Sequence, residues 1–227
     1  MTPGRVFLLI AAGWLLLAVI FIVGFGGWRN TWGATQQEVS MPLPGDSLIA
    51  GHSVRTTRAI TINAPPGEVW PWILQMGQRR GGFYTHTAFE NLMGLKIRNA
   101  WEIVPAWQSR QVGDTLFLAP GSEAVMRIAE LIPDSALVLS TILPDSLSQK
   151  APSLDAVWGF VWAFTLHPGP KPGTTRFVIR ESIEATSLSG VLNTLVEMSA
   201  WVMESGTLRG VKIRAELVGA PVAKGNR

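Results

Sequence analysis

An imidazole and a carboxylate are spaced for general acid–base chemistry near residue 90. His86 and Glu90 lie four residues apart in a predicted helix over residues 85–93, so their side chains share one helical face. Thr87 to Glu90 also fits a capping box, in which the glutamate holds the start of a helix. Together with Tyr84, these residues are the candidate acid and base groups, and the pattern leaves both interpretations open.

Motifs of other reaction classes are missing. The chain has no cysteine, and His52 and His167 complete no metal-binding spacing, so we expect neither a metal nor a cofactor. There is no nucleophile elbow, and the glycines between residues 77 and 82 have the wrong spacing for a phosphate-binding loop. Nothing in the sequence therefore nominates a reaction or a substrate.

Aromatic residues dominate one predicted strand, residues 157–166. By two-residue alternation, Trp158, Phe160, Trp162 and Phe164 all point to one face of that strand. Such a surface suits flat, apolar ligands, and it suits a filled core equally well. The other residues that we expect around a cavity are Trp72, Met76, Tyr84, Phe89 and Trp101.

The first thirty residues predict a membrane anchor. Residues 6–27 carry no charge and would form a helix of about 33 Å, enough to cross a hydrocarbon core of about 30 Å. A cleaved signal peptide is the alternative, but its apolar core would usually be about 7 to 15 residues long. The residues expected to flank the bilayer, or to let another helix approach, are Arg5, Gly13, Trp28, Arg29 and Trp32.

The charge content also fits a membrane-associated protein. Charged residues make up 15% of the chain, against about 25% in ordinary soluble domains. The formal net charge is +3, and it falls to +1 without Arg5 and Arg29, which flank the apolar segment. We therefore expect no nucleic-acid partner.

The remaining chain divides into a tether, a folded domain and a tail. We expect residues 1–28 to form the transmembrane anchor, 29–57 a Pro/Gly-rich tether, and 219–227 a flexible tail. In the domain, residues 58–218, Arg176 and Arg180 share a strand face that we expect on a solvated or ion-paired exterior. Periodicity predicts strands at 58–63, 115–118, 125–132, 137–142, 157–166 and 175–181, and helices at 66–76, 85–93 and 188–216.

Several stretches resemble the START-like (SRPBCC) superfamily, in particular its bacterial polyketide cyclase/dehydratase-related branch. Residues 58–77 read RAITINAPPGEVWPWILQMG, and further agreement occurs at 81–84, 90–92, 103–107, 112–114 and 208–216. The resemblance implies an α+β helix-grip fold, in which a curved antiparallel sheet wraps around a long C-terminal helix and encloses a hydrophobic cavity. Here one transmembrane helix would precede that fold. The superfamily includes carriers, sensors and cyclases, so the resemblance implies no catalytic set.

Three function classes follow from these observations. We expect a membrane-anchored, non-catalytic module that binds a hydrophobic small molecule at or near the bilayer. The alternatives are an accessory subunit of an integral-membrane protein complex and a polyketide cyclase/dehydratase-like enzyme that uses His86, Glu90 or Tyr84. In each case the chain would be a single-pass protein of the cell (inner) membrane, and the side that carries the domain stays open.

Overall fold

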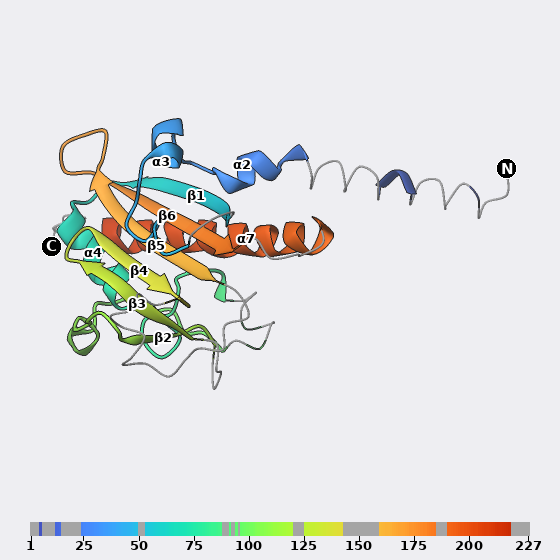
Figure 1. Ribbon diagram of the computed structural model, residues 1–227. Helices are drawn as coiled ribbons and strands as arrows, with labels where there is room; N and C mark the ends of the chain where they lie inside the picture. The colour runs from blue at the N-terminus through green and yellow to red at the C-terminus, as the bar shows by residue number, and fades with distance from the viewer. Residues whose placement is uncertain are drawn as a thin grey trace, which may run out of the picture.

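The computed structural model places helices on both faces of one antiparallel sheet (Figure 1). The strands are β1 (Ser53–Ile62), β2 (Thr115–Phe117), β3 (Val125–Ile132), β4 (Ala136–Ser140), β5 (Phe160–Pro168) and β6 (Thr175–Glu184), in the order β1-β6-β5-β4-β3-β2. Every neighbouring pair is antiparallel, which confirms the predicted α+β class. The structure describes Arg5, Asn91, Gly94 and residues 12–14, 24–49, 53–87, 96–119, 125–142, 159–184 and 190–218.

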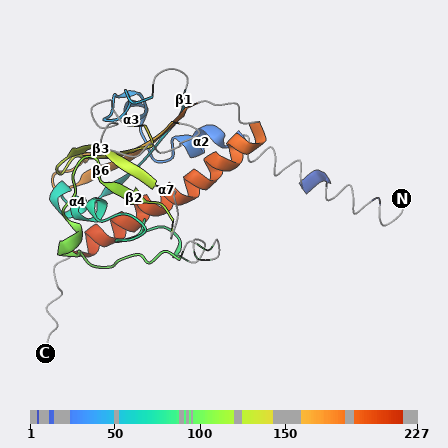
Figure 2. The same ribbon diagram turned by 60° about the horizontal axis from the view of Figure 1, so that its bottom comes forward.

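The long helix α7 (Gly190–Val218) lies across one face of the sheet, which we call the inner face (Figure 2). It is held alongside the end of β1, where Lys212 Nζ donates to the Thr61 carbonyl at 2.7 Å. One turn later, the Glu216 carboxylate accepts the backbone N–H of Asn63 at 2.7 Å. This sheet and terminal helix agree with the expected helix-grip arrangement.

Apolar side chains fill the space between the inner face and the C-terminal half of α7. Phe164 on β5, Phe177 on β6 and Leu208 on α7 are fully buried in one cluster. The short helix α4 (Pro66–Leu74) contributes Trp72 to the same cluster, and prolines open that helix as predicted. The aromatic face of β5 therefore packs toward the helices, as its two-residue alternation indicates.

The outer face of the sheet is covered by residues 34–49, which we expected to belong to a tether. Leu43 packs against Ala59 and Val178, and Ile49 joins a second apolar cluster on β4 and β5. This segment includes the helix α3 (Gln36–Ser40), and the helix α2 (Gly26–Asn30) before it also lies on the domain (Figure 1). The sequence of this segment shows no apolar periodicity. It binds the sheet through isolated apolar side chains and through its backbone carbonyls.

Two arginines of β6 bind this covering segment. Arg180 is only 1% exposed, and its Nη1 donates to Asp46 Oδ2 at 2.7 Å. Arg176 Nε donates to Glu38 Oε1 at 2.7 Å. The ion pairs agree with the expectation for this strand face. The expectation of a solvated position was wrong for Arg180, because backbone carbonyls of residues 38–41 enclose its guanidinium.

The predicted membrane anchor falls largely outside the described residues. Of residues 6–27, the structure describes 12–14 and 24–27. In the portions of the chain that are described, no helix combines the length and the apolar character that crossing a bilayer requires.

Candidate functional site

The register of the sheet gathers polar residues from three strands on the inner face. Trp162 on β5 pairs with Glu181 on β6, and Glu181 pairs in turn with Thr56 on β1. Arg58 lies two residues further along β1 and points to the same face. Glu204 meets this group from the middle of α7. We call Arg58, Trp162, Glu181 and Glu204 the buried cluster.

The guanidinium of Arg58 is the centre of the buried cluster and is fully buried. Its Nη1 donates to Glu204 Oε2 and, at 2.9 Å, to Thr56 Oγ1. Its Nε donates to the backbone carbonyl of Arg29 at 2.8 Å. Such additional hydrogen bonds offset the desolvation of a buried ion pair. One guanidinium thus joins β1, α7 and the helix α2.

Glu181 and Glu204 form the second interaction of the buried cluster, because their carboxyl groups lie close enough for each to influence the pKa of the other. Burial, with the negative charge of Glu204, raises the pKa of Glu181 well above its ordinary value. Burial also raises the pKa of Glu204, and the Arg58 guanidinium opposes that rise. Two carboxyl groups in contact do not readily ionise together. Because Arg58 pairs with Glu204, Glu181 is the one of the two carboxyl groups that holds a proton more readily.

Three polar atoms of the buried cluster have no hydrogen-bond partner within the described part of the chain. They are Arg58 Nη2, Glu204 Oε1 and Trp162 Nε1. The Trp162 indole lies close enough to Glu204 to lower the pKa of that carboxyl group, but its N–H does not meet hydrogen-bond geometry there. A buried polar atom left unpaired costs about 1–3 kcal/mol. The cluster thus keeps two donors and one acceptor unused.

Aromatic rings surround this polar set. The ring centroid of Trp162 lies 4.7 Å from that of Phe164, 6.1 Å from that of Phe83 and 6.3 Å from that of Phe160. Phe160, at the start of β5, is half-buried. The interior therefore places several aromatic rings around a small polar group, a combination of apolar and polar contacts that small-molecule sites also use.

The residues predicted to line a cavity occupy different places. Trp72, Met76 and Phe164 are packed in the core. Trp162 belongs to the buried cluster, and Phe160 lies beside it. Tyr84 is buried in the core as well, whereas Trp101 is 66% exposed. Phe89 and Trp158 lie outside the described residues.

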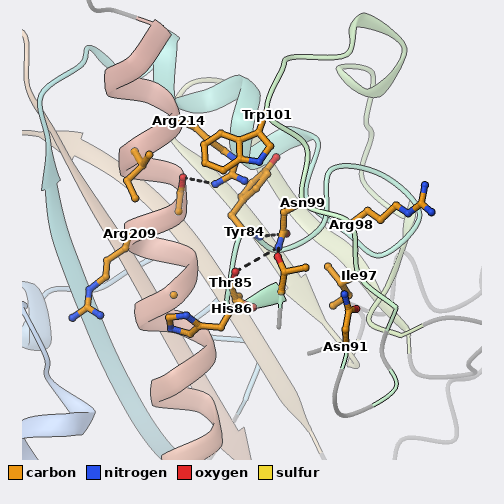
Figure 3. A pocket seen from close by; sticks show the side chains of 14 residues that line it. Tyr84, Thr85, His86, Asn91, Ile97, Arg98, Asn99, Trp101, Arg209 and Arg214 are labelled. Carbon is orange, nitrogen blue, oxygen red and sulfur yellow. Dashed lines mark hydrogen bonds between the residues drawn. The ribbon is translucent and has the colours of Figure 1, made fainter. Parts of the chain in front are cut away.

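A groove of about 590 Å³ runs beside the C-terminal half of α7, between the helix and residues 84–87, 91, 97–99 and 101 (Figure 3). The chain approaches α7 closely here because Gly210 has no side chain: a Cβ at that position would lie 2.0 Å from the Tyr84 carbonyl oxygen. Arg214 lies in the groove wall between the rings of Tyr84 and Trp101.

The predicted acid and base groups are not assembled by the described residues. His86 lines the groove, but Glu90 lies outside the described residues. The Tyr84 hydroxyl donates to the Trp72 carbonyl at 2.9 Å, and burial raises the pKa of Tyr84. That phenol is therefore held neutral and is a poor base. No group of three or more metal-binding side chains occurs in the described ranges.

The residues predicted to flank the bilayer are partly built into the domain. We expected Arg29 at the headgroup level, but it is buried, and its Nη2 lies 4.0 Å from Glu197 Oε2 on α7. Its neighbour Trp28 is 54% exposed, with its ring centroid 5.9 Å from that of Trp201. Trp32 is half-buried, and Arg5 and Gly13 are exposed.

Sequence reasoning missed the three ionisable residues of the buried cluster. The sequence did contain a clue for the two strand residues, because each charged side chain falls on the strand face that otherwise carries apolar residues. Arg58 alternates with Ile60 and Ile62 on β1, and Glu181 lies two residues after Ile179 on β6. What was missing was their pairing, which depends on the register of distant strands.

Comparisons with known proteins identify no family. No family model matches the chain, and no curated protein matches it. Similar solved structures include a protein from Mesorhizobium loti (14% identity, 73% of this chain and 98% of that chain, TM-score 0.39). Another is the ZhuI aromatase/cyclase from Streptomyces sp. R1128 (13% identity, 78% of this chain and 100% of that chain, TM-score 0.40). A third is a protein from Nitrosospira multiformis (14% identity, 70% of this chain and 94% of that chain, TM-score 0.41). Likenesses this weak carry no conclusion about ligand or activity.

The two glutamates of the buried cluster should respond differently to loss of their acidity. Glu204→Gln leaves the Arg58 guanidinium buried without its carboxylate, so we expect the free energy of unfolding to fall by about 3–5 kcal/mol. Glu181→Gln replaces a neutral acid by a neutral amide that still donates a hydrogen bond, so we expect a change below about 1 kcal/mol. Urea unfolding of the full chain in detergent at pH 7 measures both, and equal losses would contradict the proton assignment.

The stability of the Glu181→Gln variant relative to the wild type should increase with pH. The raised pKa of Glu181 stabilises the folded wild type fully below the ordinary value of 4.5, and this contribution is lost as the pH rises through the folded-state pKa. The amide of the variant does not titrate, so its contribution to the free energy of unfolding does not change with pH. Unfolding curves at several pH values above 4.5 test this, and a constant or shrinking difference would mean that the pKa of Glu181 is not raised.

Proposed function

We propose that the protein is a START-like binding module that holds a hydrophobic molecule by one polar group. The observation that carries this proposal is the unused hydrogen-bonding capacity of the buried cluster beside the aromatic face of β5. Buried polar atoms normally have partners, and a ligand would supply them here. The helix-grip arrangement, with the cluster between sheet and α7, supports uptake into the interior.

The chemistry of the cluster defines the ligand class. Arg58 Nη2 and Trp162 Nε1 are donors and Glu204 Oε1 is an acceptor, so the matching group both accepts and donates hydrogen bonds. A hydroxyl or a carboxylic acid has this property. The rings of Phe160 and Phe164 favour a flat apolar body attached to that group.

We also propose that residues 6–27 anchor the module in a membrane as a single-pass helix. The helix α2 begins at the end of this segment and is docked on α7 through the Trp28–Trp201 and Arg29–Glu197 contacts. The N-terminal half of α7 would therefore be the part of the domain nearest the bilayer (Figure 1). The same α2 touches Arg58 through the Arg29 carbonyl, so the buried cluster would lie close to the membrane.

A cyclase- or dehydratase-like activity is the second candidate, and Glu181 is the observation that favours it. A carboxylic acid that stays protonated in apolar surroundings can act as a general acid. In this case Glu181 would donate its proton to the polar group of the bound molecule. The two candidates differ in one variant: Glu181→Gln would abolish turnover in an enzyme and would leave binding in place.

The ligand should be recoverable from the purified full chain. We expect organic extraction and mass spectrometry to yield a hydrophobic molecule with a hydroxyl or carboxyl group. Trp162→Phe removes one donor and keeps most of the ring, so we expect about fivefold weaker retention, equivalent to about 1 kcal/mol.

Trp72→Phe is the matched control for this change. Trp72 is also 1% exposed with an unpaired Nε1, but it belongs to the core on α4. This variant should lose stability and keep the ligand. Recovery of no hydrophobic molecule, or equal loss in both variants, would contradict the binding proposal.

Membrane anchoring predicts that the full chain resists extraction with alkaline carbonate. Replacing Leu16 and Ile20 by arginine places two charges in the apolar segment, each costing about 2.5–3.5 kcal/mol at a helix centre. We expect this variant in the soluble fraction, and a Leu16→Val, Ile20→Val control in the pellet. A wild-type chain that is released by carbonate would contradict the anchor.

A further inference from the structure

Six cationic side chains line two adjoining hollows beside the C-terminal half of α7. The groove of Figure 3 shares Arg98 and Asn99 with a second hollow of about 350 Å³. None of the described residues that line either hollow is acidic. The six cations are Arg79, Arg80, Lys96, Arg98, Arg209 and Arg214, and none of them forms an ion pair with a carboxylate in the described part of the chain.

Arg214 is the fixed member of this set. It is 5% exposed, its Nε donates to the Ala100 carbonyl at 2.6 Å, and its Nη1 donates to the Gly210 carbonyl at 3.0 Å. Its guanidinium carbon lies 4.6 Å from the ring centroid of Tyr84 and 4.0 Å from that of Trp101. These contacts orient the guanidinium in advance, and they do not use Nη2.

Trp101 forms an apolar platform at the edge of the groove. One side of its ring meets Arg214, while the residue remains 66% exposed. The side chains of Arg98 and Arg209 point away from Arg214 in opposite directions (Figure 3). Both are exposed. The Arg209 guanidinium carbon lies 4.9 Å from the ring centroid of Trp32, so Arg209 would leave that contact to reach a bound anion. The groove thus combines a preset cation, two adjustable cations and a flat ring.

We propose that this groove binds a small molecule that carries a phosphate or carboxylate group on a planar body. The anion would bind at Arg214 with Arg98 and Arg209, because the guanidinium fork matches both anions, and the planar body would lie on Trp101. A small molecule fits better than an extended anionic surface, because Arg214 lies in the wall of a hollow that a flat surface would not enter.

The groove is separate from the buried cluster and from the proposed anchor. None of the residues of the buried cluster lines it. The α2 contacts reach α7 at Glu197 and Trp201, and Arg214 lies about 20 Å further along the helix axis. The groove therefore stands whether or not the interior binds a ligand, and it would face away from the bilayer.

Isothermal titration of the full chain with phenyl phosphate, benzoate and inorganic phosphate tests this site. We expect phenyl phosphate or benzoate to bind, and the stronger of the two identifies the anion. Arg98→Gln and Arg209→Gln should each weaken that binding about fivefold or more. Trp101→Ala should weaken binding of the aromatic probe and leave inorganic phosphate unchanged.

Lys171→Gln is the matched control, since it removes one exposed positive charge in the turn between β5 and β6. It should bind the probes like the wild type. Failure of every probe to bind, or equal weakening in the control, would overturn the proposal. So would binding to phosphatidylserine vesicles that depends on Arg98 and Arg209 without binding of any small anion.

Discussion

The ion pair between Arg58 and Glu204 is the constraint on which the rest of this structure depends. It is completely buried, and it links the first strand to the terminal helix, which are far apart in the sequence. The same guanidinium holds the carbonyl of Arg29, so the segment that follows the apolar N-terminal residues is attached at the same point. A buried pair of this kind costs desolvation on both sides, and removing either partner leaves an uncompensated charge.

This ion pair also divides α7 into two halves with different surroundings. Beyond Glu204, Leu208, Val211 and Ala215 are fully buried in a packed core. At Glu204, carboxyl groups, a guanidinium and an indole N–H meet the aromatic face of β5 with atoms left unpaired. The packed half supplies stability, and the half around Glu204 is the part where we propose that a ligand binds. Stability and binding would then be altered by different substitutions.

The order of elements and the faces of the strands were predictable, because both follow from local periodicity. Alternation placed Phe160, Trp162 and Phe164 on the inner face, and the structure agrees. Pairings over long sequence separations were not predictable. The covering of Arg180 by residues 38–46 and the joining of Arg58 to Glu204 arise from register and docking. Trp101 illustrates the same limit: its type suggested an interior residue, yet its neighbours Tyr84 and Arg214 place it at the edge of a groove.

Glutamate carboxyl ¹³C NMR of the full chain, with Glu181→Gln to assign the signal, tests the central claim most directly. The account predicts that the Glu181 carboxyl group is protonated at pH 7, and that its resonance moves when the extracted hydrophobic ligand is added back. An ionised Glu181 at pH 7, or a resonance that does not respond to the ligand, would contradict the claim that a protonated Glu181 and its cluster bind the polar group of a ligand.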